Sequence, residues 1–177
     1  MQHLHDIMSK RVDQWRQAGY PCDAYPVVAE ILAYQREPET GLLRFLRYPQ
    51  MQALETYWYL RLVEDTPHVF DLYRRLFSKT AELIKALGIP QAAFEEADYS
   101  LEELWKRIKT DDTFVRRHQL ESVRETLTLD YPSYILALAM GAGKTLLIGA
   151  IIATEFAMAL EYPGGPFVQN ALVFAPG

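Results

Sequence analysis

Apolar residues recur at steps of three and four positions through the first 130 residues, which is the period of helices that pack on one side. Prolines, glycines and capping residues divide this pattern into segments. The breaks predict helices over residues 6–18, from Pro26, from Pro49, over 69–87, over 90–97, from Leu101, and from Asp111 or Asp112 through 127. This part of the chain is therefore expected to be helical.

The pattern changes after Tyr131. An apolar run at 134–139 predicts a buried strand, residues 144–161 predict a helix, and residues 171–175 predict a second strand. A strand, a helix and a strand in that order form a right-handed parallel unit. Because a parallel sheet is buried on both faces and needs several strands, we expect this sheet to be incomplete within the chain. The expected class is α/β, mostly α by content.

The junction between the first strand and the helix has the pattern of a phosphate-binding loop, Gly141-Ala142-Gly143-Lys144-Thr145. The glycines adopt backbone angles that other residues avoid, so that consecutive N–H groups converge on a phosphate at the positive end of a helix. Lys144 adds a charge for the β and γ oxygens, and the Thr145 hydroxyl is a ligand for Mg²⁺. Lys144 and Thr145 are thus the candidate catalytic residues.

The full motif asks for glycine five residues before Gly143, where this chain has Leu138. The strand before the loop and the helix after it supply the context that the motif requires. The simpler interpretation is a glycine turn between two elements, with a solvated lysine.

Composition adds mainly exclusions. The chain has 177 residues, 18 basic and 23 acidic side chains, and a net charge of −5, which is typical of a soluble globular protein and argues against a wide nucleic-acid-binding face. Cys22 is its single cysteine, so no internal disulfide forms. The start lacks the pattern of a signal peptide, and the apolar run at 146–153 is too short to span a bilayer, so we expect a cytoplasmic protein without a membrane partner.

Residues 139–145, followed by the predicted strand ending in Ala175-Pro176, resemble the opening of superfamily 2 helicases of the DEAD/DEAH type. The resemblance implies a RecA-like ATPase domain that starts at residue 131 and is incomplete at 177. It implies ATP and Mg²⁺ as cofactors, held by the loop from Met140 to Thr145. It also implies that Pro176 and Gly177 lie in a loop that contacts the nucleic-acid backbone.

Residues 12–21 and 46–56 resemble the N-terminal part of the restriction (Res) subunit of type III restriction enzymes. The resemblance implies that Gln50, in a segment near 46–60, recognises adenine, and an amide side chain has the matching donor and acceptor. Gln119 competes for this role, because the residues around it also resemble the start of such domains. Residues near 66–112 are expected to be a helical insertion in a helical region over 1–130.

The function implied is that of the N-terminal part of an ATP-dependent helicase or translocase acting on DNA, with RNA less favoured. Endonuclease activity would lie elsewhere in the intact protein, and a methyltransferase or specificity subunit is an expected partner. Hydrolysis also needs an acid and an arginine that these residues do not supply, so we expect weak nucleotide binding without turnover. The alternatives are a P-loop kinase-like enzyme and a helical interaction module with a vestigial loop.

Overall fold

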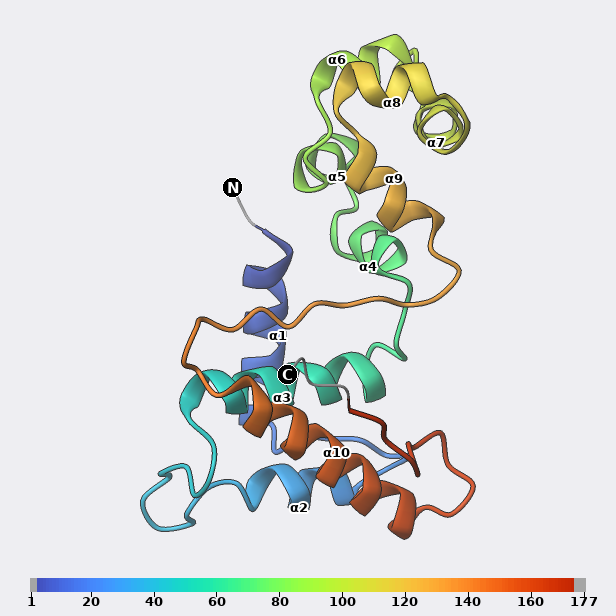
Figure 1. Cartoon of the computed structure of the whole chain (residues 1–177). Coiled ribbons are helices and arrows are strands. Elements are labelled where there is room, and N and C mark those ends of the chain that lie inside the picture. Colours follow the sequence, from blue (N-terminus) through green and yellow to red (C-terminus); the bar gives the residue numbers. More distant parts are fainter. Residues whose placement is uncertain (1–2, 174–177) are drawn as a thin grey trace. The chain divides into compact units, whose positions relative to one another are not determined.

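The computed structural model describes residues 3–173, which are mostly helical (Figure 1). The mostly-α part of the expected fold class is therefore confirmed. The helices of the described residues are α1 (Leu4–Gln17), α2 (Val27–Ala33), α3 (Tyr48–Leu62), α4 (Val69–Leu76), α5 (Thr80–Ala86), α6 (Gln91–Glu96), α7 (Leu101–Thr110), α8 (Asp112–His118), α9 (Glu121–Thr128) and α10 (Lys144–Glu161).

The chain divides into two compact units. Residues 9–65 and the chain from 136 onward form one of them, which we call the loop unit because it contains the glycine loop. Residues up to Met8 together with 66–135 form the other, which we call the helical unit. The segment near 66–112 thus belongs to a unit that continues to residue 135, while residues 9–65 share a unit with the glycine loop.

The helical unit has an apolar core of its own. The segments at the two ends of residues 66–135 contact each other. The His68 imidazole lies 3.0 Å from the carbonyl oxygen of Leu129, and the Tyr134 hydroxyl donates to the carbonyl of Pro67. The core consists of Ile84, Ile89, Ala93, Phe94, Ala97, Leu104, Ile108, Phe114, Val115, Leu120 and Leu127.

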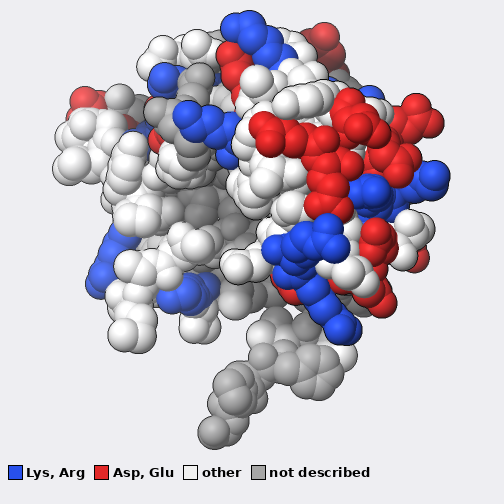
Figure 2. All heavy atoms as spheres, turned by 90° about the horizontal axis from the view of Figure 1, so that it is seen from above, with Lys and Arg blue, Asp and Glu red and all other residues white. Residues whose placement is uncertain are grey.

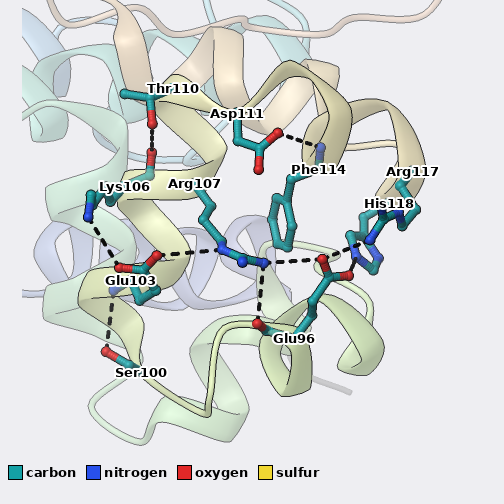
Figure 3. A network of polar contacts seen from close by, with 10 residues as sticks. All are labelled: Glu96, Ser100, Glu103, Lys106, Arg107, Thr110, Asp111, Phe114, Arg117 and His118. Carbon is teal, nitrogen blue, oxygen red and sulfur yellow. Dashed lines mark hydrogen bonds and ion pairs between the residues drawn. The ribbon is translucent and has the colours of Figure 1, made fainter.

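A polar network lies beside this core (Figure 3). The carboxylate of Glu96 accepts hydrogen bonds from Arg107 at 3.1 Å and Arg117 at 2.8 Å, and lies 2.8 Å from the His118 imidazole. The hydrogen bond with His118, followed by that with Arg117, holds the pKa of Glu96 below its ordinary value. This network ties α6 to α7 and α8 from the solvent side.

Two predicted helices of this unit are broken in the structure. The segment 69–87 is divided at Phe77, whose φ of −116° and ψ of 86° are not helical, and the segment ending at 127 is divided at Gln119, which is left-handed with a φ of 55°. The prediction of single helices was wrong. At each break the chain changes direction and an apolar side chain is buried, Phe77 at the first break and Leu120 at the second. Of the two predicted starts of α8, Asp111 is the cap, since it accepts from the N–H of Phe114, and Ser100 caps α7 by accepting from the N–H of Glu103.

In the loop unit, α10 packs against α3 and α2 (Figure 1). The predicted span of this helix, 144–161, is confirmed. α3 is buried on much of its surface, since Met51, Leu54 and Trp58 have no exposed area. It is the central helix of the unit and carries Gln50 in its first turn.

The predicted strand at 134–139 is not formed, and residues 171–173 also lack regular secondary structure. Within residues 3–173, the β-type pairing is an isolated antiparallel bridge between Arg36 and Leu43. A strand is stabilised by a neighbouring strand, and these segments have no strand partner among the described residues; Ile135 is 91% exposed and Leu172 80%. Residues 174 and 175 of the second predicted strand lie outside the described residues.

No helix in the described part of the chain is long and apolar enough to cross a membrane. On the face drawn in Figure 2, Asp and Glu side chains gather on one part with Lys and Arg side chains beside them, and much of the rest is uncharged.

Candidate functional site

The glycine loop has the backbone conformation that its sequence predicts. Gly141 has a φ of 73° and Gly143 a φ of 76°, both in the left-handed region that favours glycine. Gly143 is the N-terminal cap of α10, and its carbonyl accepts from the N–H groups of Leu146 and Leu147. The helix thus begins directly at Lys144, without a side-chain cap hydrogen bond.

The first N–H groups of α10 are open. Those of Lys144 and Thr145 have no acceptor among the described residues, and both residues are exposed. These groups stand at the positive end of an 18-residue helix, where the macrodipole favours a negative charge. Such an end binds phosphate or carboxylate groups.

Lys144 contacts its own loop. Its ammonium group donates to the carbonyl oxygen of Ala139 at 3.1 Å, and its side chain is exposed. The amine is therefore held to the loop by one carbonyl, which a stronger, charged acceptor could replace. The Met140 side chain next to it is 97% exposed and fills no space in the loop.

Gln50 reaches the loop from α3, and 1% of its surface is exposed. Its amide nitrogen donates to the carbonyl oxygens of Ala142 at 2.8 Å and Gly143 at 2.9 Å. Its amide oxygen accepts from the N–H of Arg47 at 2.7 Å, which caps the start of α3. Both amide protons are thus used within the protein, and the adenine contact that the resemblance implies requires at least one of these hydrogen bonds to break.

Arg47 is a site residue to which the sequence assigned no role. Its guanidinium group lies 3.4 Å from the carbonyl oxygen of Gly141, and the residue is exposed. It places a second positive charge beside the loop that carries Lys144. The signal available was its position three residues before Gln50, which does not by itself distinguish a ligand-facing arginine from a solvated one.

A buried carboxylate fixes α10 against α3. Glu155 is 2% exposed and accepts from the Tyr57 hydroxyl, the Arg61 guanidinium and the N–H of Val168. Burial, together with the adjacent Glu155, raises the pKa of Tyr57. One residue away on each helix, the Trp58 indole donates to the Thr154 hydroxyl at 3.1 Å. The sequence shows Glu155 as a charge inside an apolar run, but its partners are distant along the chain.

A second buried carboxylate fixes α3 against α1. Glu55 has no exposed surface, and it accepts from Arg16 at 3.1 Å and from the Tyr20 hydroxyl at 2.7 Å. Burial raises the pKa of Glu55, and the hydrogen bond from Tyr20 and the charge of Arg16 oppose that effect. Together with Glu155, it holds α3 between two neighbouring helices.

The remaining predicted residues do not all lie at the loop. Gln119 is exposed at the end of α8 in the helical unit, whereas Gln50 contacts the glycine loop directly. Pro176 and Gly177 lie outside the described residues. Thr145, the predicted Mg²⁺ ligand, is exposed beside Lys144.

The polar groups of the loop match those needed to bind a nucleoside triphosphate together with Mg²⁺. Open N–H groups and the Lys144 ammonium match phosphate oxygens, and a hydroxyl is a ligand type that Mg²⁺ accepts together with phosphate oxygens and water. Among the described residues, no three His, Cys, Asp or Glu side chains gather in a metal-binding group. The Thr145 hydroxyl is the group of this loop that would hold the ion.

Comparison with protein-family models, with curated proteins and with solved structures finds no match for this chain.

Proposed function

We propose that the loop unit binds the terminal phosphates of ATP with Mg²⁺, as the phosphate loop of an ATP-dependent nucleic-acid helicase or translocase. The observation that carries this proposal is the open start of α10, where the N–H groups of Lys144 and Thr145 have no acceptor in the described residues and the Lys144 amine is held to the same loop at Ala139. Left-handed Gly141 and Gly143 bring the backbone to this point without side chains in the way.

Each residue has a separate role in the proposed complex. The loop amides and the helix end neutralise phosphate oxygens, and Lys144 leaves the carbonyl of Ala139 to contact them. The Thr145 hydroxyl orients the metal ion. Mg²⁺ supplies the charge that offsets the negative charge on the β and γ phosphates. The chain's own contribution is therefore binding and orientation, and we expect weak binding without appreciable turnover.

We further propose that α10 belongs to a RecA-like layer in which strands pair with residues 134–139 and 171–175. α10 is apolar around its whole circumference, which is typical of a helix buried on more than one side. In the structure one side packs on α3 and α2, while Leu146, Ile148 and Leu160 stay exposed. Strands at 134–139 would cover part of this apolar surface.

The wider role rests on the resemblance of residues 139–145 and 171–176 to superfamily 2 helicases, and of residues 12–21 and 46–56 to the Res subunit. On that basis we propose DNA as the polymer, a restriction or DNA-processing system in the cytoplasm as the setting, and a methyltransferase or specificity subunit as a partner. The net charge of −5 supports local phosphate contacts rather than a broad basic face as the means of binding DNA.

The test is isothermal titration of the chain with ATP and Mg²⁺, comparing Lys144→Ala with Lys109→Ala. Lys109 is an exposed lysine of the helical unit and serves as the matched control. Because a charge-assisted hydrogen bond contributes about 1.5–3 kcal/mol, Lys144→Ala should weaken binding about tenfold or more, with Lys109→Ala unchanged. Absence of binding by the unmodified chain, or equal binding by the Lys144→Ala variant, would overturn the proposal.

A further inference from the structure

We propose that Gln50 is a positioning residue that sets the direction of the loop N–H groups by holding the carbonyl groups on the other side of the same peptide planes. The proposal rests on the proposed function, since it assigns a role within the phosphate site. It differs from the role that the resemblance implies, because Gln50 would act on phosphate binding through the loop and not through the base.

The stereochemistry of the peptide bond carries the argument. In a planar trans peptide, the carbonyl oxygen and the amide hydrogen point in opposite directions. Gln50 holds the carbonyl oxygen of Ala142, whose peptide plane includes the N–H of Gly143, and the carbonyl oxygen of Gly143, whose plane includes the N–H of Lys144. Both N–H groups must therefore point away from Gln50. Neither has an acceptor among the described residues.

Gln50 itself is fixed, as a positioning residue must be. Its amide oxygen is bound to the N–H of Arg47, which determines which end of the amide faces the loop. Its neighbour Met51 and the next turn at Leu54 have no exposed surface, so the start of α3 is held in the core. The amide thus presents two donors to the loop from a rigid helix.

The loop needs such a support. Gly141 and Gly143 are left-handed, and glycine has more accessible backbone conformations than any other residue. Donors that already point toward the anion bind it without the cost of ordering the loop. Removing the Gln50 amide should therefore weaken binding of any triphosphate, whatever base it carries.

The test compares three probes, namely ATP, GTP and inorganic triphosphate, each with Mg²⁺ in isothermal titration. The variants are Gln50→Leu, Gln50→Glu and Gln52→Leu. Gln50→Glu keeps an acceptor for the N–H of Arg47 but presents no donor to the two loop carbonyls. Gln52 lies on the same helix and donates to Ser9 at 3.0 Å, away from the loop, so it is the matched control.

We expect both Gln50 variants to weaken all three probes by a similar factor, about tenfold, and Gln52→Leu to change none. Weakened ATP binding with GTP and inorganic triphosphate unchanged would overturn the proposal in favour of adenine recognition. Unchanged affinity for all three in folded Gln50 variants would overturn it as well. Failure of the unmodified chain to bind inorganic triphosphate or ATP is a separate result, which removes the proposed function itself.

A spectroscopic measurement covers the case in which the Gln50 variants fail to fold. Inorganic triphosphate added to the unmodified chain should shift the backbone amide signals of Gly143 and Lys144, while the side-chain amide signals of Gln50 keep their positions with either triphosphate or ATP. A shift of the Gln50 side-chain signals with ATP alone would overturn the positioning role.

Discussion

The side-chain amide of Gln50 lies directly over the Cα atom of Gly143, and it donates a hydrogen bond of 2.9 Å to the carbonyl of that glycine. A β-carbon added to Gly143 would collide with the Gln50 amide nitrogen, whereas a β-carbon on Gly141 would meet no other atom. The two glycines have nearly the same backbone angle but different surroundings. Comparing alanine substitutions at the two glycines therefore separates the cost of a left-handed alanine from the cost of displacing the Gln50 amide.

Gly143→Ala should therefore cost more stability than Gly141→Ala. An alanine in the left-handed region costs about 1–2 kcal/mol, which is the expected loss of unfolding free energy for Gly141→Ala. Gly143→Ala adds displacement of the Gln50 amide and loss of its hydrogen bonds to the loop. Urea denaturation of both variants measures the difference, and equal losses would show that the amide does not constrain Gly143.

The proposed role of Thr145 predicts how Mg²⁺ changes the affinity for ATP. Thr145→Ala should remove the gain in ATP affinity that Mg²⁺ provides, because the hydroxyl is the metal ligand that the protein supplies. Affinities measured with Mg²⁺ and with a chelator should then be similar for Thr145→Ala and clearly different for the unmodified chain. Thr145→Ser keeps the hydroxyl and should keep the gain. Retention of the Mg²⁺ effect by the alanine variant would exclude Thr145 as a ligand.

Local patterns were sufficient for much of the loop unit. The span of α10 follows from Gly143 before it and from the turn at Pro163 after it. The left-handed angles of Gly141 and Gly143 follow from the glycine pattern of the loop, because glycine adopts these angles readily. Gln50 was selected as a site residue, and the structure brings it to the loop. Its contact partners were not predictable, because the hydrogen bonds to Ala142 and Gly143 join positions more than ninety residues apart.

The missed features depend on tertiary packing. Gln119 is not a glycine and gives no local signal of a left-handed turn, yet the turn is needed to bring Leu120 into the core. The run at 134–139 has strand composition, but pairing requires a neighbour that the described residues do not provide. Arg47 likewise shows no pattern along the sequence that marks it as a neighbour of the loop.

The buried carboxylate of Glu155 predicts a large loss of stability when it is removed. Glu155→Ala leaves the Arg61 guanidinium and the Tyr57 hydroxyl without their acceptor, and removing one partner of a buried ion pair typically costs about 3–5 kcal/mol. Glu161→Ala, at an exposed position of the same helix, should stay within about 0.5 kcal/mol. Urea denaturation measures both variants. A similar small effect for the two would show that Glu155 contributes little to the packing of α10 on α3.

The Glu96 network predicts a pH dependence in the helical unit. The pKa of Glu96 is lowered, first by the hydrogen bond with His118 and then by Arg117, so the folded state binds the proton of this carboxyl less readily than the unfolded state does. Its contribution to stability is therefore present above the ordinary pKa of 4.5 and is lost as the pH falls through the lower folded value. Removing the charge should remove this dependence.

Glu96→Gln should thus destabilise the helical unit at about pH 5.5, and the difference from the unmodified chain should shrink as the pH falls below 4.5. Hydrogen exchange of the Phe114 and Val115 amides, compared between the two proteins at each pH, reports on α8, which the network joins to α6. Glu102→Gln, at an exposed position that takes no part in the network, is the control and should leave exchange unchanged. A difference that stays constant across this range would mean that the charge of Glu96 is not what stabilises the contact between these helices.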